Sequence, residues 1–158
     1  MALAACSIGF AGGGLSKDIK TVAVPSFLND TADPTLTLLV TQAVKQAMES
    51  RLGLRAATEE RADAVVHGRV VRYEPDQPVS FSGNQIGTSA AQQVTVTKRQ
   101  VEMTISMEVI DSKTGKKLYE GSNVLVFGQY DPGREQDGKR KALDDLVKKL
   151  IDGVQSNW

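Results

Sequence analysis

The chain has 158 residues, a length that fits one domain with a single hydrophobic core. Nineteen basic and nineteen acidic residues give a formal net charge of zero, which argues against a nucleic-acid partner because nucleic-acid-binding domains are usually basic. A single cysteine and a single histidine exclude an internal disulfide and remove most metal-dependent and nucleophilic catalysis. We therefore predict a protein that is not an enzyme, with no metal and no cofactor.

The first residues resemble a lipidation site. The chain begins Met-Ala-Leu-Ala-Ala-Cys-Ser, and the four residues ending at Cys6 fit the lipobox of bacterial lipoproteins. Because no basic region and no apolar region precede the lipobox, we interpret Met1 to Ala5 as the remnant of a truncated or re-started signal peptide. We expect a covalent lipid on Cys6 as a membrane anchor, and Ser7 favours the outer membrane. The alternative is that Cys6 is an ordinary buried thiol.

A leader and one folded domain are expected. Residues 1–17 hold the lipobox remnant and a glycine-rich, flexible leader, and residues 18–158 form a single α+β domain. The three glycines from Gly12 to Gly14 do not make a phosphate loop, because the required G-x-x-x-x-G-K-[ST] spacing is absent.

The first part of the domain reads as a strand, a helix and a short strand. Residues 19–27 are β-branched and apolar and predict a strand. Asp33 as N-cap and Pro34 in the first turn predict the start of a helix, and Gly53 predicts its end. Residues 54–57 are expected to form a second, short strand.

A third strand is predicted from Ala64 to Tyr73, closed by Pro75 and Pro78. Residues 77–93 are rich in Ser, Gly, Asn and Gln and contain few large apolar side chains. They predict a long loop or a mobile hairpin tip, which is either functional or disordered.

The clearest pattern lies between residues 100 and 109, where apolar and polar side chains alternate strictly and predict a strand with one buried face. Residues 111–115 predict a hairpin turn. The partner strand is expected over residues 116–128 with a bulge at Gly121, and a loop over residues 130–138.

The last segment predicts a helix with one apolar stripe, which Trp158 continues. We expect both helices to pack on one face of a mixed, mostly antiparallel four- to five-stranded sheet, in the order β-α-β-β-β-β-α. The opposite sheet face is polar enough for solvent or for a hydrated partner surface. The helical stripe consists of Leu143, Leu146, Val147, Leu150, Ile151 and Val154.

Several segments in the same order resemble the LptE family of lipopolysaccharide-assembly lipoproteins, across nearly the whole chain. They are the lipobox with the leader residues 8–10, and the segments 19–29, 60–70 and 111–121. The resemblance implies a lipoprotein on the periplasmic side of the outer membrane. It also implies that the protein binds and plugs the LptD-type outer-membrane β-barrel and assists lipopolysaccharide assembly, with the barrel and lipopolysaccharide as partners.

Single pieces of this pattern also occur in other periplasmic lipoproteins. The alternative is therefore an interaction lipoprotein of another envelope machine, such as a cell-wall synthase activator or a secretion-channel subunit. A secretion channel would need long amphipathic hairpins, for which residues 77–100 are the one candidate. The oligomeric state stays open, and a one-to-one complex is the family expectation.

Lipopolysaccharide is anionic, so candidate contacts are cations that reach phosphates. Two groups qualify, one at the predicted hairpin turn and one at the predicted start of the long strand, and they need not be neighbours. The alternative is a solvated set that protects a sheet edge. The basic segment 139–141 is a partner contact or an exposed helix turn, and His67 has no second metal ligand near it in the sequence. The two groups are Lys113, Lys116 and Lys117, and Lys98 and Arg99.

Overall fold

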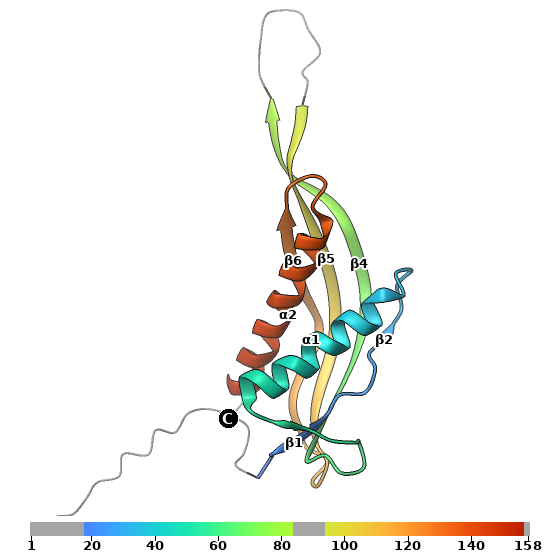
Figure 1. The fold of residues 1–158 in the computed structure, drawn as a ribbon, viewed down its shortest axis with the longest axis vertical. Coiled ribbons are helices and arrows are strands. Elements are labelled where there is room, and N and C mark those ends of the chain that lie inside the picture. The colour runs from blue at the N-terminus through green and yellow to red at the C-terminus, as the bar shows by residue number, and fades with distance from the viewer. Residues whose placement is uncertain (1–17, 84–93, 157–158) are drawn as a thin grey trace, which may run out of the picture.

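The computed structural model describes residues 18–83 and 94–156 (Figure 1). The predicted α+β class, with two helices on one face of a mixed sheet, is confirmed, although the sheet has six strands rather than four or five. The elements in chain order are β1 (Thr21–Ala23), β2 (Leu28–Asn29), α1 (Thr35–Leu52), β3 (Arg55–Ala56), β4 (Ala64–Gly83), β5 (Val94–Asp111), β6 (Lys117–Tyr130) and α2 (Glu135–Ser156).

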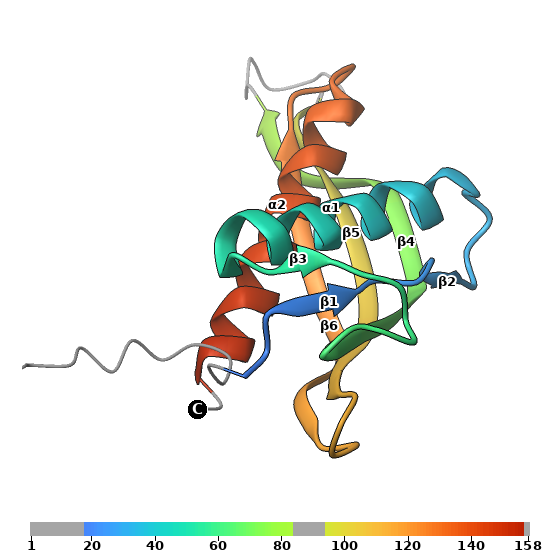
Figure 2. The same ribbon diagram turned by 60° about the horizontal axis from the view of Figure 1, so that its bottom comes forward.

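Three long strands form the frame of the sheet. Strands β4, β5 and β6 are antiparallel neighbours, and the short strands β1, β2 and β3 add parallel pairs on the β4 side. The order across the sheet is β3-β1-β4-β5-β6, with β2 also beside β4. Helix α1 lies across the strands while α2 runs alongside β6 (Figure 2). The polar side chains of β5 point to the sheet face away from the helices, as the alternation predicts, and Leu125 and Phe127 of β6 are also exposed there.

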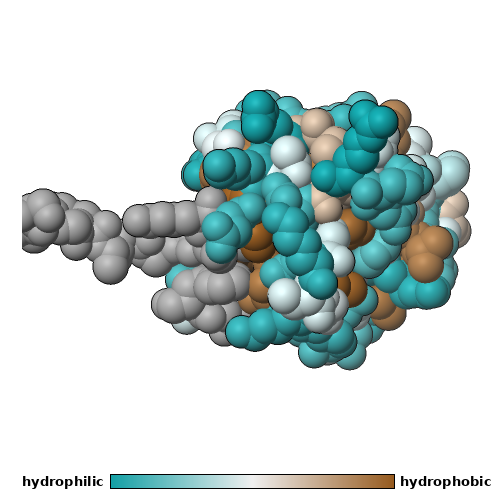
Figure 3. Space-filling view, turned by 90° about the horizontal axis from the view of Figure 1, so that it is seen from below, coloured by the Kyte–Doolittle hydropathy of each residue, from teal (hydrophilic) through white to brown (hydrophobic). Residues whose placement is uncertain are grey.

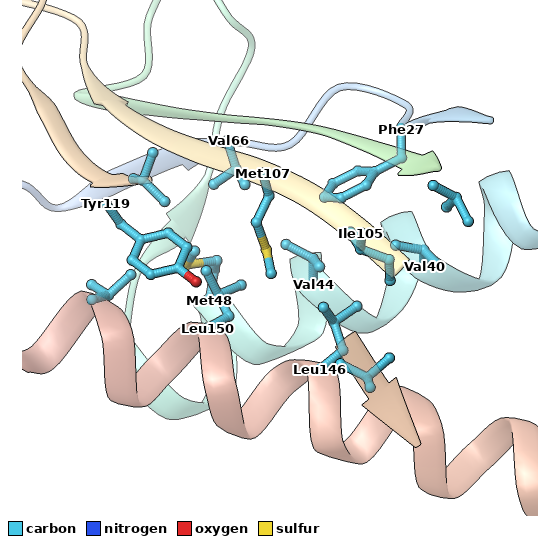
Figure 4. Close-up of a cluster of buried hydrophobic side chains, with 14 of the residues drawn as sticks. Phe27, Val40, Val44, Met48, Val66, Ile105, Met107, Tyr119, Leu146 and Leu150 are labelled. Atoms are coloured by element: carbon cyan, nitrogen blue, oxygen red, sulfur yellow. The ribbon is translucent and has the colours of Figure 1, made fainter. Parts of the chain in front are cut away.

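The core lies between the sheet and the two helices. The alternating apolar residues of β5 are all buried, which confirms that strand's one-sided pattern. Side chains of α1 and α2 meet them from the same side, including Val44, Met48, Leu146 and Leu150 (Figure 4). Each large apolar side chain buried in this way stabilises the fold by about 1.5–3 kcal/mol.

Local signals place both ends of α1. The carboxylate of Asp33 accepts the backbone N–H of Thr35 at 3.0 Å, and Pro34 has helical dihedral angles. The helix begins at Thr35, one residue later than predicted. Gly53 ends the helix in the left-handed conformation with φ of 67°, as predicted.

The first predicted strand, over residues 19–27, is wrong as one continuous element. The chain forms β1, leaves the sheet around Pro25, and returns as β2 beside the same strand, β4. Phe27 lies between the two pieces and packs over Gly68, where an added Cβ would come within 2.0 Å of the Phe27 ring. Gly68 therefore provides the space that lets Phe27 enter the core.

The prediction that Pro75 and Pro78 end the third strand is also wrong, because β4 continues to Gly83. Strands β1 and β2 cover β4 only as far as Val70, so both prolines lie on an edge where a missing N–H leaves no ladder partner unpaired. Register shifts next to both prolines accommodate them. Of the two alternatives predicted for residues 77–93, a loop is wrong for residues 77–83, which pair with β5 as a hairpin does, and residues 84–93 lie outside the described structure.

Two further boundaries differ from the prediction. Strand β5 begins at Val94 rather than at Lys98, and Gly138 lies inside α2 rather than in the preceding loop. An added Cβ at Gly138 would come within 2.4 Å of the Tyr130 ring, and one at Gly128 within 1.9 Å of the Gly138 carbonyl oxygen. The two glycines allow α2 to pack along β6 with the two backbones in contact. This packing outweighs the weak helix propensity of glycine.

The turn between β5 and β6 has the predicted form. Gly115 has φ of 68°, and the carboxylate of Asp111 accepts the backbone N–H of Lys113 at 2.8 Å. The predicted bulge in β6 is confirmed in the residues that follow Gly121, where the register shifts and Asn123 has φ of 53°. Trp158 lies outside the described residues.

Candidate interaction surfaces

The predicted cations at the β5–β6 turn lie together, and two of them are held in ion pairs. Lys113 Nζ lies 3.1 Å from Asp63, and Lys117 Nζ lies 2.6 Å from Glu120 and 3.0 Å from Glu108. These carboxylates raise the pKa values of both lysines. An anionic ligand at this turn would compete with carboxylates already in place. Seen from this end, the described surface is mostly hydrophilic (Figure 3).

Asp63 binds several groups at the end of the molecule where the β5–β6 turn lies. Its Oδ2 accepts the backbone N–H groups of Lys20 at 3.0 Å and Thr21 at 3.1 Å, and the Thr21 hydroxyl at 2.9 Å. These donors, the Lys20 N–H foremost, hold the pKa of Asp63 far below its usual range, and Lys113 adds to the effect. Asp63 therefore joins β1, the start of β4 and the β5–β6 turn.

Lys98 and Arg99 lie near the other end of β5, about 40 Å away at roughly 3.3 Å per residue. Lys98 Nζ pairs with Asp131 at 2.6 Å, and Arg99 pairs with Asp76. The Tyr130 hydroxyl donates to the carbonyl oxygen of Pro75 at 2.8 Å, and burial raises the pKa of Tyr130 to about 12. The five predicted cations therefore form two separate groups. Whether either group contacts an anionic lipid stays a prediction.

The side chains of the basic segment 139–141 form ion pairs and hydrogen bonds with other residues of the same chain. Lys139 Nζ pairs with Asp33 at 2.9 Å, with only 17% and 22% of their side chains exposed, and it lies 5.3 Å from the centre of the Tyr73 ring. This contact joins the start of α1 to α2. Arg140 pairs with Asp137 at 3.1 Å on the helix surface.

The free edge of β6 is covered by side chains of α2, a contact that the sequence analysis did not predict. We call Lys141, Asp145 and Lys149 of α2 the edge cap of β6. They recur every four residues along the flank of α2 that faces the outer backbone of β6. Lys141 Nζ donates to Gln129 O at 2.8 Å, the Phe127 N–H donates to Asp145 Oδ2 at 3.1 Å, and Lys149 Nζ donates to Leu125 O at 2.6 Å.

The polar sheet face carries a shallow hollow of about 240 Å³. His67 lies in its wall with Nε2 3.8 Å from Glu59, and Arg69 pairs with Asp30 at 2.8 Å. Within residues 18–83 and 94–156, no three His, Cys, Asp or Glu side chains are placed to share a metal ion. The other lining residues include Leu28, Ser106, Glu108, Glu120 and Ser122.

A two-stranded arm projects beyond the rest of the sheet (Figure 1). We define the arm as residues 77–83 of β4 and 94–97 of β5. The last residue of β6, Tyr130, pairs with Arg99, so the described arm residues of β5 have only β4 as a neighbour. The arm carries two exposed apolar side chains, Phe81 with 58% and Val79 with 37% of its surface accessible.

The chain is similar to several solved structures. A Xanthomonas campestris protein of the DUF330 family has a TM-score of 0.51 at 14% identity, covering 88% of this chain and 85% of that one. The PelC dodecamer of Paraburkholderia phytofirmans has a TM-score of 0.47 at 18% identity, covering 87% and 88%. A Neisseria meningitidis lipoprotein has a TM-score of 0.45 at 15% identity, covering 87% and 99%. No curated protein sequence matches this chain.

The fold itself, with two helices on one face of a mixed sheet, defines the structural class of the protein. A family model described as LptE, lipopolysaccharide-assembly, matches residues 19–157. The chain belongs to the LptE family, which confirms the resemblance seen in its sequence segments. Among the described residues, neither helix combines the length and the apolar character needed to cross a membrane. The predicted lipidation site, Cys6, lies outside the described residues.

Proposed function

We propose that this protein is a non-enzymatic accessory lipoprotein that binds and plugs the LptD-type outer-membrane β-barrel and assists lipopolysaccharide assembly. The observation that carries the proposal is the family match, which runs through the whole described fold from β1 to α2. The lipid on Cys6 anchors the chain to the periplasmic side of the outer membrane, and Ser7 supports that location. No covalent step is assigned, because the sequence has one histidine and one cysteine.

The architecture supports a role in binding. The body is a layer of helices on a sheet with one main hydrophobic core, and many of its surface charges are matched in ion pairs. Such a body changes little on binding and presents fixed surfaces to a partner. Its arm adds exposed apolar side chains that a partner can bury.

The test is affinity purification of the full-length tagged protein, co-expressed with the LptD-type barrel of the same bacterium. We expect the barrel at near-equal stoichiometry by mass spectrometry. The Cys6→Ala variant serves as the control for anchoring, and we expect it to leave the outer-membrane fraction while the purified domain stays folded. Recovery of the wild-type protein without the barrel would contradict the proposal.

A second candidate is an interaction lipoprotein of another envelope machine, which the arm itself favours. A secretion-channel subunit needs a long hairpin from each copy, and β4 and β5 form such a hairpin. That function predicts a ring of copies in the same purification, and a cell-wall synthase activator predicts the synthase. Either result without a barrel would replace the first proposal with this one.

A further inference from the structure

The described residues of the arm are uncharged, and so is the sequence between its two strands. The sequence from Gln77 to Thr97 contains no Asp, Glu, Lys, Arg or His, although 24% of the chain is charged. Charged residues resume at both ends, with Asp76 before the stretch and Lys98 after it. Soluble protein surfaces normally carry about 25–35% charged residues, and the centres of protein interfaces are depleted of them. The absence of charge is therefore a property that the arm shares with the centres of protein interfaces.

The two faces of the arm differ in polarity without using charge. Phe81 is directly opposite Val96 on one face, and Ser82 is directly opposite Thr95 on the other. Phe81 is more than half exposed and is not part of the buried core. A partner that covers the arm must supply an apolar contact on one side and hydrogen bonds on the other.

The edges of the arm need hydrogen-bonding partners when they leave water. In the described part of the chain, β1 and β2 cover β4 only to Val70, and β6 covers β5 only to Arg99. The outer backbone groups of the arm therefore have no strand beside them. In lipid hydrocarbon each such group costs several kcal/mol, whereas a protein groove supplies amide, carbonyl and hydroxyl partners. An anionic lipid surface is also a poor fit, since the arm has no cation for phosphate.

We propose that the arm inserts into an uncharged groove or lumen of a partner protein, with Phe81 and Val96 against apolar side chains and the free backbone edge hydrogen-bonded to the partner. The ion pairs Lys98–Asp131 and Arg99–Asp76 sit at the base of the arm and remain partly exposed, so they mark the depth of insertion. This inference rests on the proposed function, because the partner it commits to is the LptD-type barrel.

Single charges placed on the arm test this inference in the full-length, co-expressed protein. We expect Phe81→Lys and Thr95→Lys each to lower the amount of co-purified barrel at least tenfold, because a charge buried without a partner is strongly unfavourable. The uncharged variant Phe81→Ser should lower it less. The matched control is Leu38→Lys on α1, which is 60% exposed and should leave the barrel yield unchanged. Circular dichroism should show that all four variants are folded.

The outcomes separate this inference from the function on which it rests. If the wild-type protein captures no barrel, the proposed function fails, and the inferred partner fails with it. If the wild-type protein captures the barrel and both lysine variants of the arm do so equally well, only the arm inference is overturned.

Two further measurements exclude other occupants of the arm. Flotation of the Cys6→Ser protein with zwitterionic and with anionic vesicles should show no binding. Binding that Phe81→Lys abolishes would mean that lipid covers the arm, and would overturn the inference. Light scattering should show a monomer, and a self-association lost in Phe81→Lys would overturn it in favour of a second copy of this chain.

Discussion

The two outer edges of the three long strands differ in whether other elements cover their backbone groups. The edge formed by β6 is closed by the edge cap. Its three side chains form hydrogen bonds with backbone groups of Leu125, Phe127 and Gln129. The edge formed by β4 is covered by short strands only to Val70, and continues into an arm with exposed backbone. Unpaired strand edges invite association with other chains. The molecule therefore prevents strand addition on one side and leaves it open on the other.

The ends of β5 differ in the same way. At the turn, Asp63 and the lysines form a connected set of hydrogen bonds and ion pairs within the chain. Beyond Lys98, the arm has no charges and few contacts with the body. The contrast teaches that stability is concentrated in the body, while the arm contributes little to folding and is available for binding.

The largest difference in stability between body and arm is expected for a substitution where α2 contacts β6. Gly128→Ala places a Cβ 1.9 Å from the carbonyl oxygen of Gly138, and this backbone atom cannot move without displacing α2. We expect a loss of more than about 4 kcal/mol in the free energy of unfolding, measured by urea denaturation. In the arm, Gly83→Ala meets no atom within 4 Å and should change stability by less than about 0.5 kcal/mol.

A smaller effect is expected from truncating side chains in the two regions. Leu146 is fully buried between α2 and the sheet, and Leu146→Ala should cost about 2–5 kcal/mol. Phe81→Ala removes a larger side chain from the arm but should cost less than about 0.5 kcal/mol, since Phe81 is mostly exposed. Thermal and urea denaturation measure both values. Equal losses would show that the arm packs on the body.

Opening the capped edge should have a moderate effect on stability and a specific effect on β6. Asp145→Ala removes the acceptor of the Phe127 N–H and the partner of Lys149, and should cost about 1–2 kcal/mol. Hydrogen exchange at the Phe127 amide should become faster, and light scattering should detect self-association through β6. Asp144→Ala, at the exposed neighbouring position, is the matched control. Unchanged exchange at Phe127 would mean that the cap does not protect the edge.

The smallest predicted effect concerns acid stability at the Asp63 end. The pKa of Asp63 is lowered in the fold from its ordinary value of 3.8, so its contribution is complete above that value. The contribution is lost as the pH falls below 3.8 toward the folded pKa. We expect Asp63→Asn to flatten the acid side of a plot of stability against pH, relative to Glu49→Gln on the exposed face of α1. A curve parallel to the wild-type curve would contradict the role given to Asp63.

Local sequence patterns determined much of the body. The alternation in β5 specified its buried face, because successive side chains of a strand point to opposite sides. Asp33 and Gly53 marked the ends of α1, since their hydrogen bonds and dihedral angles involve only nearby residues. The order of the segments 19–29, 60–70 and 111–121 also indicated the LptE family, which the family model confirms.

Tertiary structure decided the edges and the close contacts. Pro75 and Pro78 stay within β4 because the strand is at an edge there, a fact that no neighbour in sequence reveals. Gly138 is helical because Gly128, on another element, leaves room for its backbone. The edge cap is present in the sequence as charged residues at every fourth position, but its role follows only from α2 lying along β6. A backbone group's need for a partner is set by what lies beside it in space, and sequence patterns report only what lies beside it in the chain.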